Sequence, residues 1–129
     1  MRRIYLDSAP TIYLVEQVEP YYTRLQTVLD PADYRVVSHL TRMECRVLPV
    51  RNGDQRLLAD YDAFFAVQIQ EIVELNAAVM DKATEIRALY RFGIADSIHL
   101  AAAVVSGCDA FLTNDLRLAG FSELTIITL

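Results

Sequence analysis

The segment IYLDS at residues 4–8 decides the fold of this chain, because a short apolar run ends there abruptly in a carboxylate. The segment AFLTND at residues 110–115 repeats the arrangement near the other end of the chain. In each case an apolar strand delivers an aspartate, Asp7 or Asp115, beside a small hydroxyl or amide side chain. Open parallel sheets bind ligands beyond the carboxyl ends of their strands. Either aspartate alone could be a turn or capping residue, but the repetition favours one shared site.

Outward from these segments, strand patterns alternate with helix patterns. Strands are expected at residues 3–6, 34–38, 110–112 and 125–127, with a third strand of vague limits between 67 and 73. Helices are expected at residues 8–29 with an interruption near Pro20, at 40–48, 55–65 and 76–92, and from Asp96 onward. Pro49 is expected to end the helix before it, and Gly93 the long helix. The alternation predicts an α/β fold, a three-layer α/β/α sandwich around a parallel, five-stranded sheet.

The composition is that of one domain. The 129 residues are expected to form a single domain over residues 1–129, and a hydrophobic content of 53% suffices for a core without disulfides or structural metals. The net charge of −5 argues against nucleic-acid binding by the whole surface, which needs an excess of Lys and Arg. It does not exclude an enzyme that acts on a phosphodiester, because a bound divalent cation changes the local sign of the charge.

The cysteines and the apolar segments indicate a cytoplasmic protein. Cys45 and Cys108 lie far apart in apolar surroundings, so two reduced thiols are expected, although the sequence also permits a disulfide. There is no CxxC pair and no Cys/His cluster of the kind that binds zinc. Asp7 interrupts the N-terminal apolar run, so no signal peptide is expected, and no stretch is long and uncharged enough to span a membrane.

Two further acids could join Asp7 and Asp115. Asp96 opens a predicted helix, where the helix dipole stabilises an ionised carboxylate, although capping alone would explain it. Glu44 lies beside two arginines and, taken alone, has the surroundings of a surface glutamate. Two unit charges about 4 Å apart repel by roughly 4 kcal/mol at an effective dielectric of about 20, so four clustered carboxylates need a cation or shared protons. All-oxygen ligands favour Mg²⁺ or Mn²⁺ over zinc, and such an ion can activate water for attack on phosphorus.

Four segments together resemble the PIN domains, and within that family the VapC-like toxins of toxin–antitoxin pairs. They are IYLDSA at residues 4–9, SHLTRME at 38–44, ADSIHLAAA at 95–103 and CDAFLTND at 108–115. All four occur in the order that the family has, and the resemblance covers nearly the whole chain. One departure is the Pro10–Thr11 pair, where small apolar residues are expected, but proline fits the first turn of a helix.

The resemblance implies a magnesium- or manganese-dependent endoribonuclease. The family's four acids, which bind the metal directly or through water, match Asp7, Glu44, Asp96 and Asp115. Its small polar residues that support the site match Ser8, Thr113 and Asn114. The resemblance also implies an RNA substrate, a homodimer and a cognate antitoxin whose tail covers the active site.

Two histidines and two arginines have less certain roles from the sequence. His99 follows Asp96 by three positions and is interpreted as a packed or capping histidine, and His39 is left unassigned. Arg87 and Arg91 lie one helical turn apart on the polar side of the long predicted helix. They form either a solvated helix face or an RNA-backbone contact near the cleft.

The N-terminal helical segments are more apolar than a solvated face requires. Their large side chains include Tyr13, Tyr21, Tyr22 and Leu25. Part of this set is expected in the core, and an exposed remainder would mark a homodimer or antitoxin surface.

Two other functions compete with an active ribonuclease. The first is a catalytically inactive PIN fold that binds RNA or protein, but degenerate copies more often lose an acid, whereas all four are present here. The second is a phosphate-handling α/β enzyme. Aspartyl phosphatases usually carry a second acid two residues after the nucleophile, where this chain has Ala9. A phospho-receiver needs a late lysine, whereas no lysine follows Lys82.

Overall fold

A parallel five-stranded sheet forms the middle of the molecule. The computed structural model describes all residues 1–129. The strands are β1 (Arg3–Leu6), β2 (Tyr34–Ser38), β3 (Glu71–Val73), β4 (Ala110–Thr113) and β5 (Thr125–Thr128). Their order is β3-β2-β1-β4-β5, and every neighbouring pair is parallel. The predicted parallel, five-stranded sheet is therefore confirmed.

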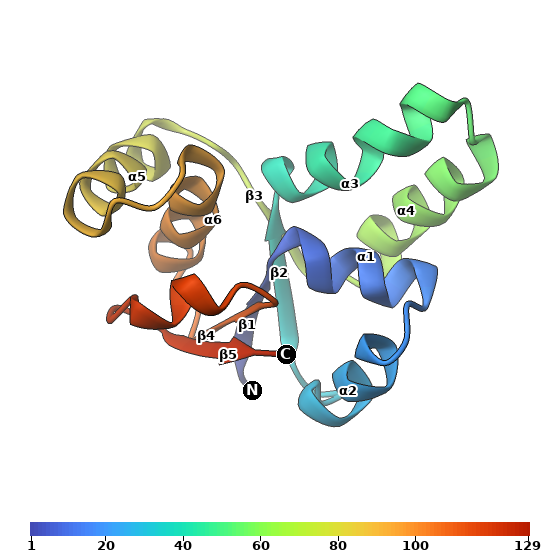
Figure 1. Cartoon of the computed structure of the whole chain (residues 1–129), viewed down its shortest axis with the longest axis horizontal. Helices are drawn as coiled ribbons and strands as arrows, with labels where there is room; N and C mark the ends of the chain where they lie inside the picture. The colour runs from blue at the N-terminus through green and yellow to red at the C-terminus, as the bar shows by residue number, and fades with distance from the viewer.

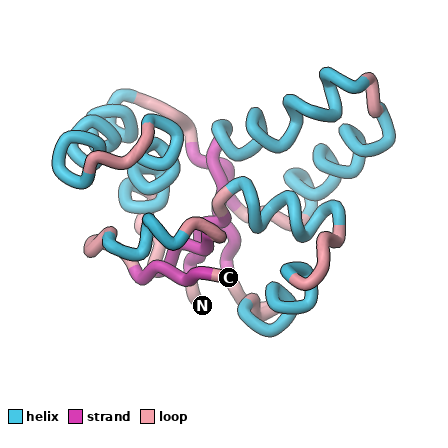
Figure 2. The backbone as a smooth tube through the Cα atoms, in the orientation of Figure 1, coloured by secondary structure: helices cyan, strands magenta, loops and turns pink.

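Helices cover both faces of the sheet (Figures 1 and 2). One face packs against α1 (Ser8–Glu16), α2 (Tyr21–Val28), α3 (His39–Asn52) and α4 (Gln55–Val67). The other face packs against α5 (Ala77–Tyr90), α6 (Ile94–Val105) and the short 3₁₀ helix η1 (Leu116–Gly120). Successive side chains of β1 alternate between the two cores, with Ile4 and Leu6 in the first and Tyr5 in the second. All three are fully buried because helices cover both faces of this strand, and the predicted three-layer sandwich is confirmed.

The register of the two central strands brings two of the predicted acids to one edge of the sheet. Leu6 of β1 pairs with Leu112 of β4, and the backbone N–H of Asp7 donates to the Leu112 carbonyl at 3.0 Å. Asp7 and Thr113 therefore lie side by side at the carboxyl ends of their strands. From β1 the chain crosses to β2 on one side, whereas it reaches β4 on the other side only after β3, so this edge is the switch point of the sheet.

One predicted helix end is wrong, because α3 does not stop at Pro49 but continues to Asn52. A proline inside a helix removes one backbone hydrogen bond and usually costs about 3 kcal/mol. Pro49 is nevertheless buried, and α3 is fixed at its start by reciprocal hydrogen bonds between Ser38 and Thr41. The helix ends instead at Gly53, whose left-handed φ of 65° turns the chain away.

The predicted third strand is shorter than its apolar residues suggested. α4 continues as far as Val67, and only residues Glu71–Val73 pair with β2. Phe64 and Phe65 at the end of α4 are buried against the sheet, so helical packing extends into the apolar run that resembled a strand.

The turn between α5 and α6 also differs from the prediction. α5 ends at Tyr90, because Arg91 adopts a left-handed φ of 62°. Gly93 is the N-cap of α6 rather than the end of α5. Asp96 therefore lies in the first turn of α6 and does not cap it.

The two thiols and the helices agree with the sequence expectations. Cys45 and Cys108 are free and buried, and burial raises the pKa of the Cys45 thiol to about 12, which leaves it unreactive at neutral pH. None of the helices has both the length and the apolar character that crossing a bilayer requires.

Candidate active site

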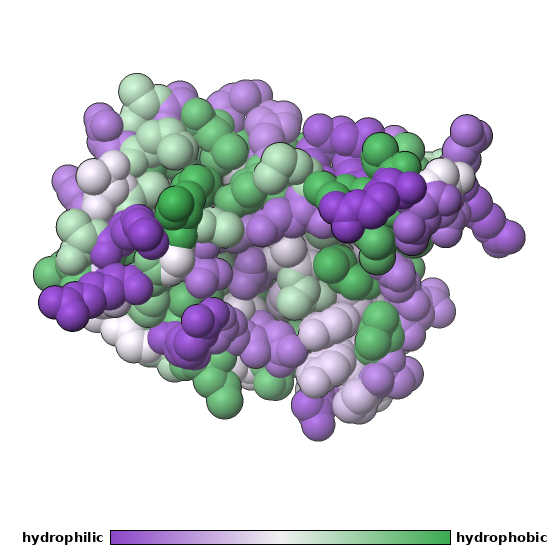
Figure 3. Space-filling model, turned by 45° about the horizontal axis from the view of Figure 1, so that its top comes forward, coloured by the Kyte–Doolittle hydropathy of each residue, from purple (hydrophilic) through white to green (hydrophobic).

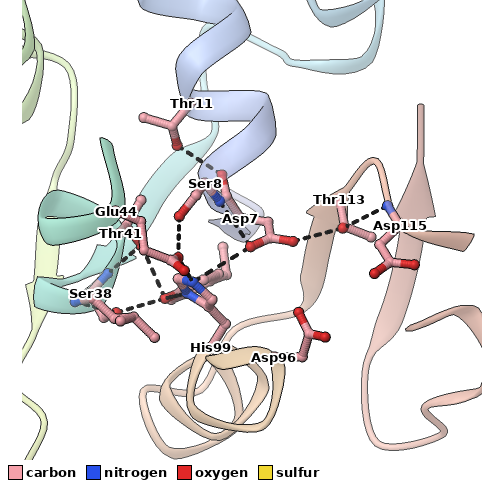
Figure 4. Close-up of polar contacts among 12 residues, drawn as sticks. Asp7, Ser8, Thr11, Ser38, Thr41, Glu44, Asp96, His99, Thr113 and Asp115 are labelled. Atoms are coloured by element: carbon pink, nitrogen blue, oxygen red, sulfur yellow. Dashed lines mark hydrogen bonds and ion pairs between the residues drawn. The ribbon is translucent and has the colours of Figure 1, made fainter. Parts of the chain in front are cut away.

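Asp7 is held rigidly between the end of β1 and the start of α1. Its Oδ1 accepts a hydrogen bond from the backbone N–H of Ser8 at 2.9 Å, which caps α1. Its Oδ2 accepts from the hydroxyl of Thr113 at 2.8 Å. The side chain of Asp7 is only 14% exposed. These contacts fix the carboxylate at the edge of the sheet, where it faces the other acids (Figure 4).

The end of β4 supports both Asp7 and Asp115. The hydroxyl of Thr113 donates to Asp7 and accepts from the backbone N–H of Asp115 at 3.0 Å, so one side chain connects the two strand ends. Asn114 donates through its Nδ2 to the hydroxyl of Tyr13 at 2.9 Å, which ties this turn to α1. The structure thus gives Thr113 and Asn114 definite contacts around the predicted acids.

Asp96 projects from the first turn of α6 toward the same edge. Burial raises the pKa of this carboxyl, and the charges of Asp7 and Asp115 raise it further, whereas the opposing effects of Arg117 and His99 are smaller. Asp96 is thus a partly desolvated carboxyl that lies close enough to Asp7 and Asp115 to feel their charges.

Glu44 reaches the site from α3. Its Oε1 accepts hydrogen bonds from the hydroxyl of Ser8 at 2.6 Å and from Nε2 of His99 at 2.6 Å. The bond from His99 has the largest effect and, with the bond from Ser8, holds the pKa of Glu44 below its ordinary value although burial opposes this. Glu44 is therefore an ionised member of the cluster, not the isolated surface glutamate that its sequence neighbours suggest.

All four predicted acids line one cavity of about 300 Å³. Its other walls are Ser8, Ala9, His99, Thr113 and Asn114. Figure 4 shows Asp7 at the centre, with Glu44 and His99 on one side of it and Thr113 and Asp115 on the other. The structure therefore brings together the four acids and the three supporting residues chosen from the sequence.

Two contacts of this edge were not foreseen from the sequence. His99 is packed, as expected, but it also lies in the cavity wall and contacts Glu44. Arg117 was not singled out, yet its Nη2 lies 2.5 Å from Oδ2 of Asp115 and 3.7 Å from Oδ2 of Asp96. This ion pair lowers the pKa of Asp115. The spacing of Arg117 two residues after an acid was the only sequence signal for it.

The donor set of the cavity fits a hard divalent cation. Every candidate ligand is a carboxylate, hydroxyl or amide oxygen, as Mg²⁺ and Mn²⁺ prefer. No three acidic or histidine side chains already stand in a coordinating arrangement. Arg117 occupies both oxygens of Asp115 through Nε and Nη2, so ligation by Asp115 would require this guanidinium to move.

The remaining candidates lie outside this cavity. Arg87 and Arg91 line a separate depression at the end of α5, where Nη1 of Arg87 donates to the Phe92 carbonyl at 2.8 Å. His39 lies 3.2 Å from a carboxylate oxygen of Glu74 near the surface. None of these three side chains is part of the acidic site.

Comparison with known proteins gives a family match. The chain matches the PIN domain over residues 4–124. Curated proteins offer no significant match to it.

Solved structures share the fold at low sequence identity. VapBC2 from Rickettsia felis, bound to a promoter DNA fragment, is 15% identical with a TM-score of 0.77, and 98% of each chain is covered. DNA-bound VapBC from Salmonella typhimurium is 20% identical with a TM-score of 0.77, over 99% of this chain and 98% of that one. VapC20 from Mycobacterium tuberculosis, described as a sarcin-ricin loop cleaving toxin, is 17% identical with a TM-score of 0.70, over 94% of this chain and 98% of that one. At these identities the likeness shows a common fold.

Proposed function

Because the chain belongs to the PIN-domain family, we propose that it is a Mg²⁺- or Mn²⁺-dependent endoribonuclease and the toxin of a type II toxin–antitoxin pair. The observation that carries this proposal is the convergence of Asp7, Glu44, Asp96 and Asp115 on one cavity at the switch point of the sheet. Four carboxylates in that position repel one another unless a cation joins them. The proposal places the protein in the cytoplasm, where its two free cysteines would stay reduced.

The acids divide into two groups by their contacts. Asp7, Asp96 and Asp115 surround the open side of the cavity and would hold the ion, with Glu44 joining them directly or through water. When bound, a divalent ion polarises a phosphate oxygen and lowers the pKa of a coordinated water. Thr113 keeps Asp7 and the backbone at Asp115 in place, and Ser8 orients Glu44. The chain would thus supply oxygen ligands rather than a nucleophile of its own, and Asp115 would join them once Arg117 has moved away.

An acidic protein needs local positive charge to receive RNA. Arg117 is 78% exposed at the rim of the cavity and offers a guanidinium to a backbone phosphate once its carboxylate partners are taken by a cation. Arg87 and Arg91 lie on a different part of the surface and would contact the RNA backbone away from the reacting bond.

We extend the proposal to a protein partner, a cognate antitoxin. A cavity of about 590 Å³ lies between α1, α2 and α4, with apolar walls such as Leu14 and Val15 and polar ones such as Arg35 and Asp60. It is separate from the four acids of the site, and an amphipathic segment of a partner would fit it. The similar structures from Rickettsia felis and Salmonella typhimurium are VapBC proteins, which supports a partner of this kind.

A homodimer is also proposed, with the N-terminal helices at or near its interface. Tyr13, Tyr21 and Tyr22 are half-buried, and Tyr13 stacks on Tyr21 with ring centroids 4.4 Å apart. Leu25, which the sequence grouped with them, is fully buried in the core and cannot contribute to an interface. On the face drawn in Figure 3, hydrophobic residues are interspersed with hydrophilic ones. Light scattering at micromolar concentration tests the dimer, and a strict monomer would contradict it.

The function is tested with purified protein on RNA. Asp7→Asn and Asp115→Asn preserve shape and remove one charge each, so either should cut the cleavage rate by orders of magnitude and weaken Mn²⁺ binding. The two losses should not add, because both residues serve one ion. EDTA should abolish cleavage by the wild type, and Mg²⁺ or Mn²⁺ should restore it.

Asp81→Asn is the matched control, since Asp81 is an exposed acid on α5 outside the cavity. It should leave cleavage unchanged. Full cleavage in EDTA, or by both site variants, would overturn the catalytic assignment. RNA binding by a wild type that cuts no RNA would favour the inactive binding module instead.

A further inference from the structure

A buried polar chain leads from the middle of the sheet to Glu44. It starts at Tyr5 of β1, whose ring is completely buried. The Tyr5 hydroxyl lies 2.9 Å from Oγ of Ser38, 3.3 Å from Oγ1 of Thr41 and 2.7 Å from Nδ1 of His99. Three elements besides β1 thus supply partners to a single hydroxyl, namely the end of β2, the start of α3 and α6. Such a cluster fixes the position of each member.

His99 connects this cluster to the acidic cavity. Its Nδ1 faces Tyr5, while its Nε2 lies 2.6 Å from Oε1 of Glu44 and 3.6 Å from Oδ1 of Asp7. The whole residue is only 1% exposed, and its ring packs edge-on against that of Tyr5 with centroids 5.7 Å apart. Both ring nitrogens have partners, so the imidazole cannot turn without losing one of them.

The partner at Glu44 determines which ring nitrogen carries a proton. An ionised carboxylate only accepts hydrogen bonds, so His99 must donate from Nε2. Nδ1 accepts a hydrogen bond from the Tyr5 hydroxyl when the single phenol proton points to it, and donates one when that proton goes to Ser38. Nε2 carries its proton in both arrangements. The contact with Glu44 is therefore a constant feature of the site.

These contacts give hydrogen-bond partners to one carboxylate oxygen of Glu44 and leave the other without any. Oε1 receives both donors, the hydroxyl of Ser8 and Nε2 of His99. Oε2 makes no hydrogen bond within the chain. The Glu44 side chain is 33% exposed and lines the cavity. A glutamate has a long, flexible side chain, and fixing one oxygen from two sides selects a single orientation for the other.

We propose that His99, held in place by Tyr5, is a positioning residue that fixes Oε1 of Glu44 and so presents Oε2 to the acid cavity. This inference deepens the proposed ribonuclease function and rests on it. Hydrogen-bonded partners that orient a ligand carboxylate are worth roughly 10- to 100-fold in metal affinity or activity. Glu44 would affect the chemical step and not the binding of RNA. When its orientation is lost, kcat should therefore fall, whereas KM for RNA should not rise.

Two substitutions of His99 separate positioning from packing. In His99→Gln the side-chain amide takes the place of Nε2 and still donates to Glu44. In His99→Asn the shorter amide takes the place of Nδ1 and leaves Glu44 without this donor. We expect His99→Gln to keep Mn²⁺ affinity and kcat within a few-fold of wild type, and His99→Asn to lose roughly 10- to 100-fold in one or both. Calorimetric Mn²⁺ titration, steady-state RNA cleavage and thermal unfolding of each variant supply the measurements.

A second pair of variants keeps the test valid if the His99 variants unfold. Tyr5→Phe removes the hydroxyl that faces Nδ1 without touching the cavity, and should weaken Mn²⁺ affinity and kcat while ¹⁵N NMR shows a changed hydrogen bond at Nδ1 of His99. Tyr61→Phe is the control, because Tyr61 is equally buried in the other core and its hydroxyl bonds to Glu16, away from the cavity. It should leave all three readouts unchanged.

The outcomes distinguish failure of the inference from failure of the function. Equal Mn²⁺ affinity and kcat for His99→Gln, His99→Asn and wild type, alongside inactive Asp7→Asn, would overturn the positioning role and leave the ribonuclease standing. Equal losses in Tyr5→Phe and Tyr61→Phe would also overturn it, since general destabilisation would then explain both. A wild type that neither binds Mn²⁺ nor cleaves RNA would overturn the function and the inference together.

Discussion

At the scale of single residues, Arg117 is the cation that the chain itself places on the acidic site. Its guanidinium contacts both oxygens of Asp115 and lies near Asp96, in the region where a divalent ion would bind. An ion must displace this charge before Asp115 can serve as a ligand. The Arg117 side chain of this ion pair is exposed to solvent, so dissolved salt strongly screens the attraction between the two charges.

Arg117→Ala should therefore bind Mn²⁺ several-fold more tightly than wild type at low salt, because no internal cation competes for Asp115. The gain should shrink as the salt concentration rises. Cleavage should not improve in parallel, since the same guanidinium is proposed to meet the RNA phosphate. Calorimetric Mn²⁺ titration at two salt concentrations measures the effect. Arg56→Ala, at an exposed residue of α4, controls for the change in net charge. Equal affinities in all three proteins would show that Arg117 does not compete with the ion.

At the scale of elements, caps and turns decide where the helices of this chain end. Pro49 was expected to end α3, but the end comes four residues later at Gly53, which has φ of 65° and no atom within 4 Å of the position of a Cβ. An alanine there would meet no clash and would suffer only the backbone strain of the left-handed region.

Gly53→Ala should lower the free energy of unfolding by roughly 1 kcal/mol, the usual cost of a left-handed non-glycine residue. Gly120→Ala is the matched control, because Gly120 also has open space around its Cβ position but no positive φ. It should be neutral or slightly stabilising. Urea unfolding followed by circular dichroism compares the two. Equal midpoints for both variants would mean that α3 does not depend on its glycine terminator.

At the scale of the whole molecule, the sequence predicted the two central strands well, because β1 and β4 each contain a short apolar run that a polar residue follows. The segments IYL and AFL are buried on both faces of the sheet. Such burial requires consecutive apolar residues, and this run can be recognised in the sequence without knowledge of the neighbouring strands. Asp7 could be predicted because it directly follows such a strand, and Asp115 because only Asn114 separates it from the end of β4.

His99 and Arg117 could not be assigned from the sequence, because their partners come from other elements or from a turn. His99 acquires its role only when α6 packs against β1 and α3, which brings Tyr5 and Glu44 to its two nitrogens. Glu44 had no sequence signal of its own beyond the family resemblance, since its Ser8 and His99 partners are 36 and 55 residues away. Pro49 misled the prediction because a proline's local preference was overridden by packing.

The two edges of the sheet hold different groups of charged residues. The acids of the site lie at the carboxyl ends of the strands, and a structural ion pair lies at the amino ends. Asp33 accepts hydrogen bonds from Nε of Arg2 at 3.1 Å, from its Nη2 at 2.6 Å and from the backbone N–H of Asp30 at 2.9 Å. Its side chain is 4% exposed, and Arg2 also donates to the Val28 carbonyl at 3.0 Å. The pair thus joins the start of β1 to the end of α2.

This pair gives the stability of the fold a defined pH dependence. Burial alone would raise the pKa of Asp33, but the hydrogen bonds from Arg2 and Asp30 and the charges of Arg2 and Arg35 outweigh it and leave the pKa lowered. A carboxyl whose pKa is lower in the folded state contributes stability that is fully present above its unfolded pKa, about 3.9. That contribution is lost as the pH falls through the lower, folded pKa.

Asp33→Asn should lower the free energy of unfolding by about 1 to 3 kcal/mol at neutral pH, because it removes the charge that pairs with Arg2 and replaces one acceptor oxygen by an amide donor. The difference from wild type should stay constant between about pH 5 and 8 and shrink below about pH 4, as the carboxyl becomes protonated first in the unfolded chain and then, at lower pH, in the folded protein. RNA cleavage at neutral pH and moderate temperature should be unchanged, because Asp33 lies at the opposite edge of the sheet from the acids. Urea titrations across this pH range measure the first effect, with Asp81→Asn as the exposed control. A difference that persists undiminished at pH 3 would show that the Asp33 carboxylate is not the source of the stability, and a loss of cleavage would show that the two edges of the sheet are coupled.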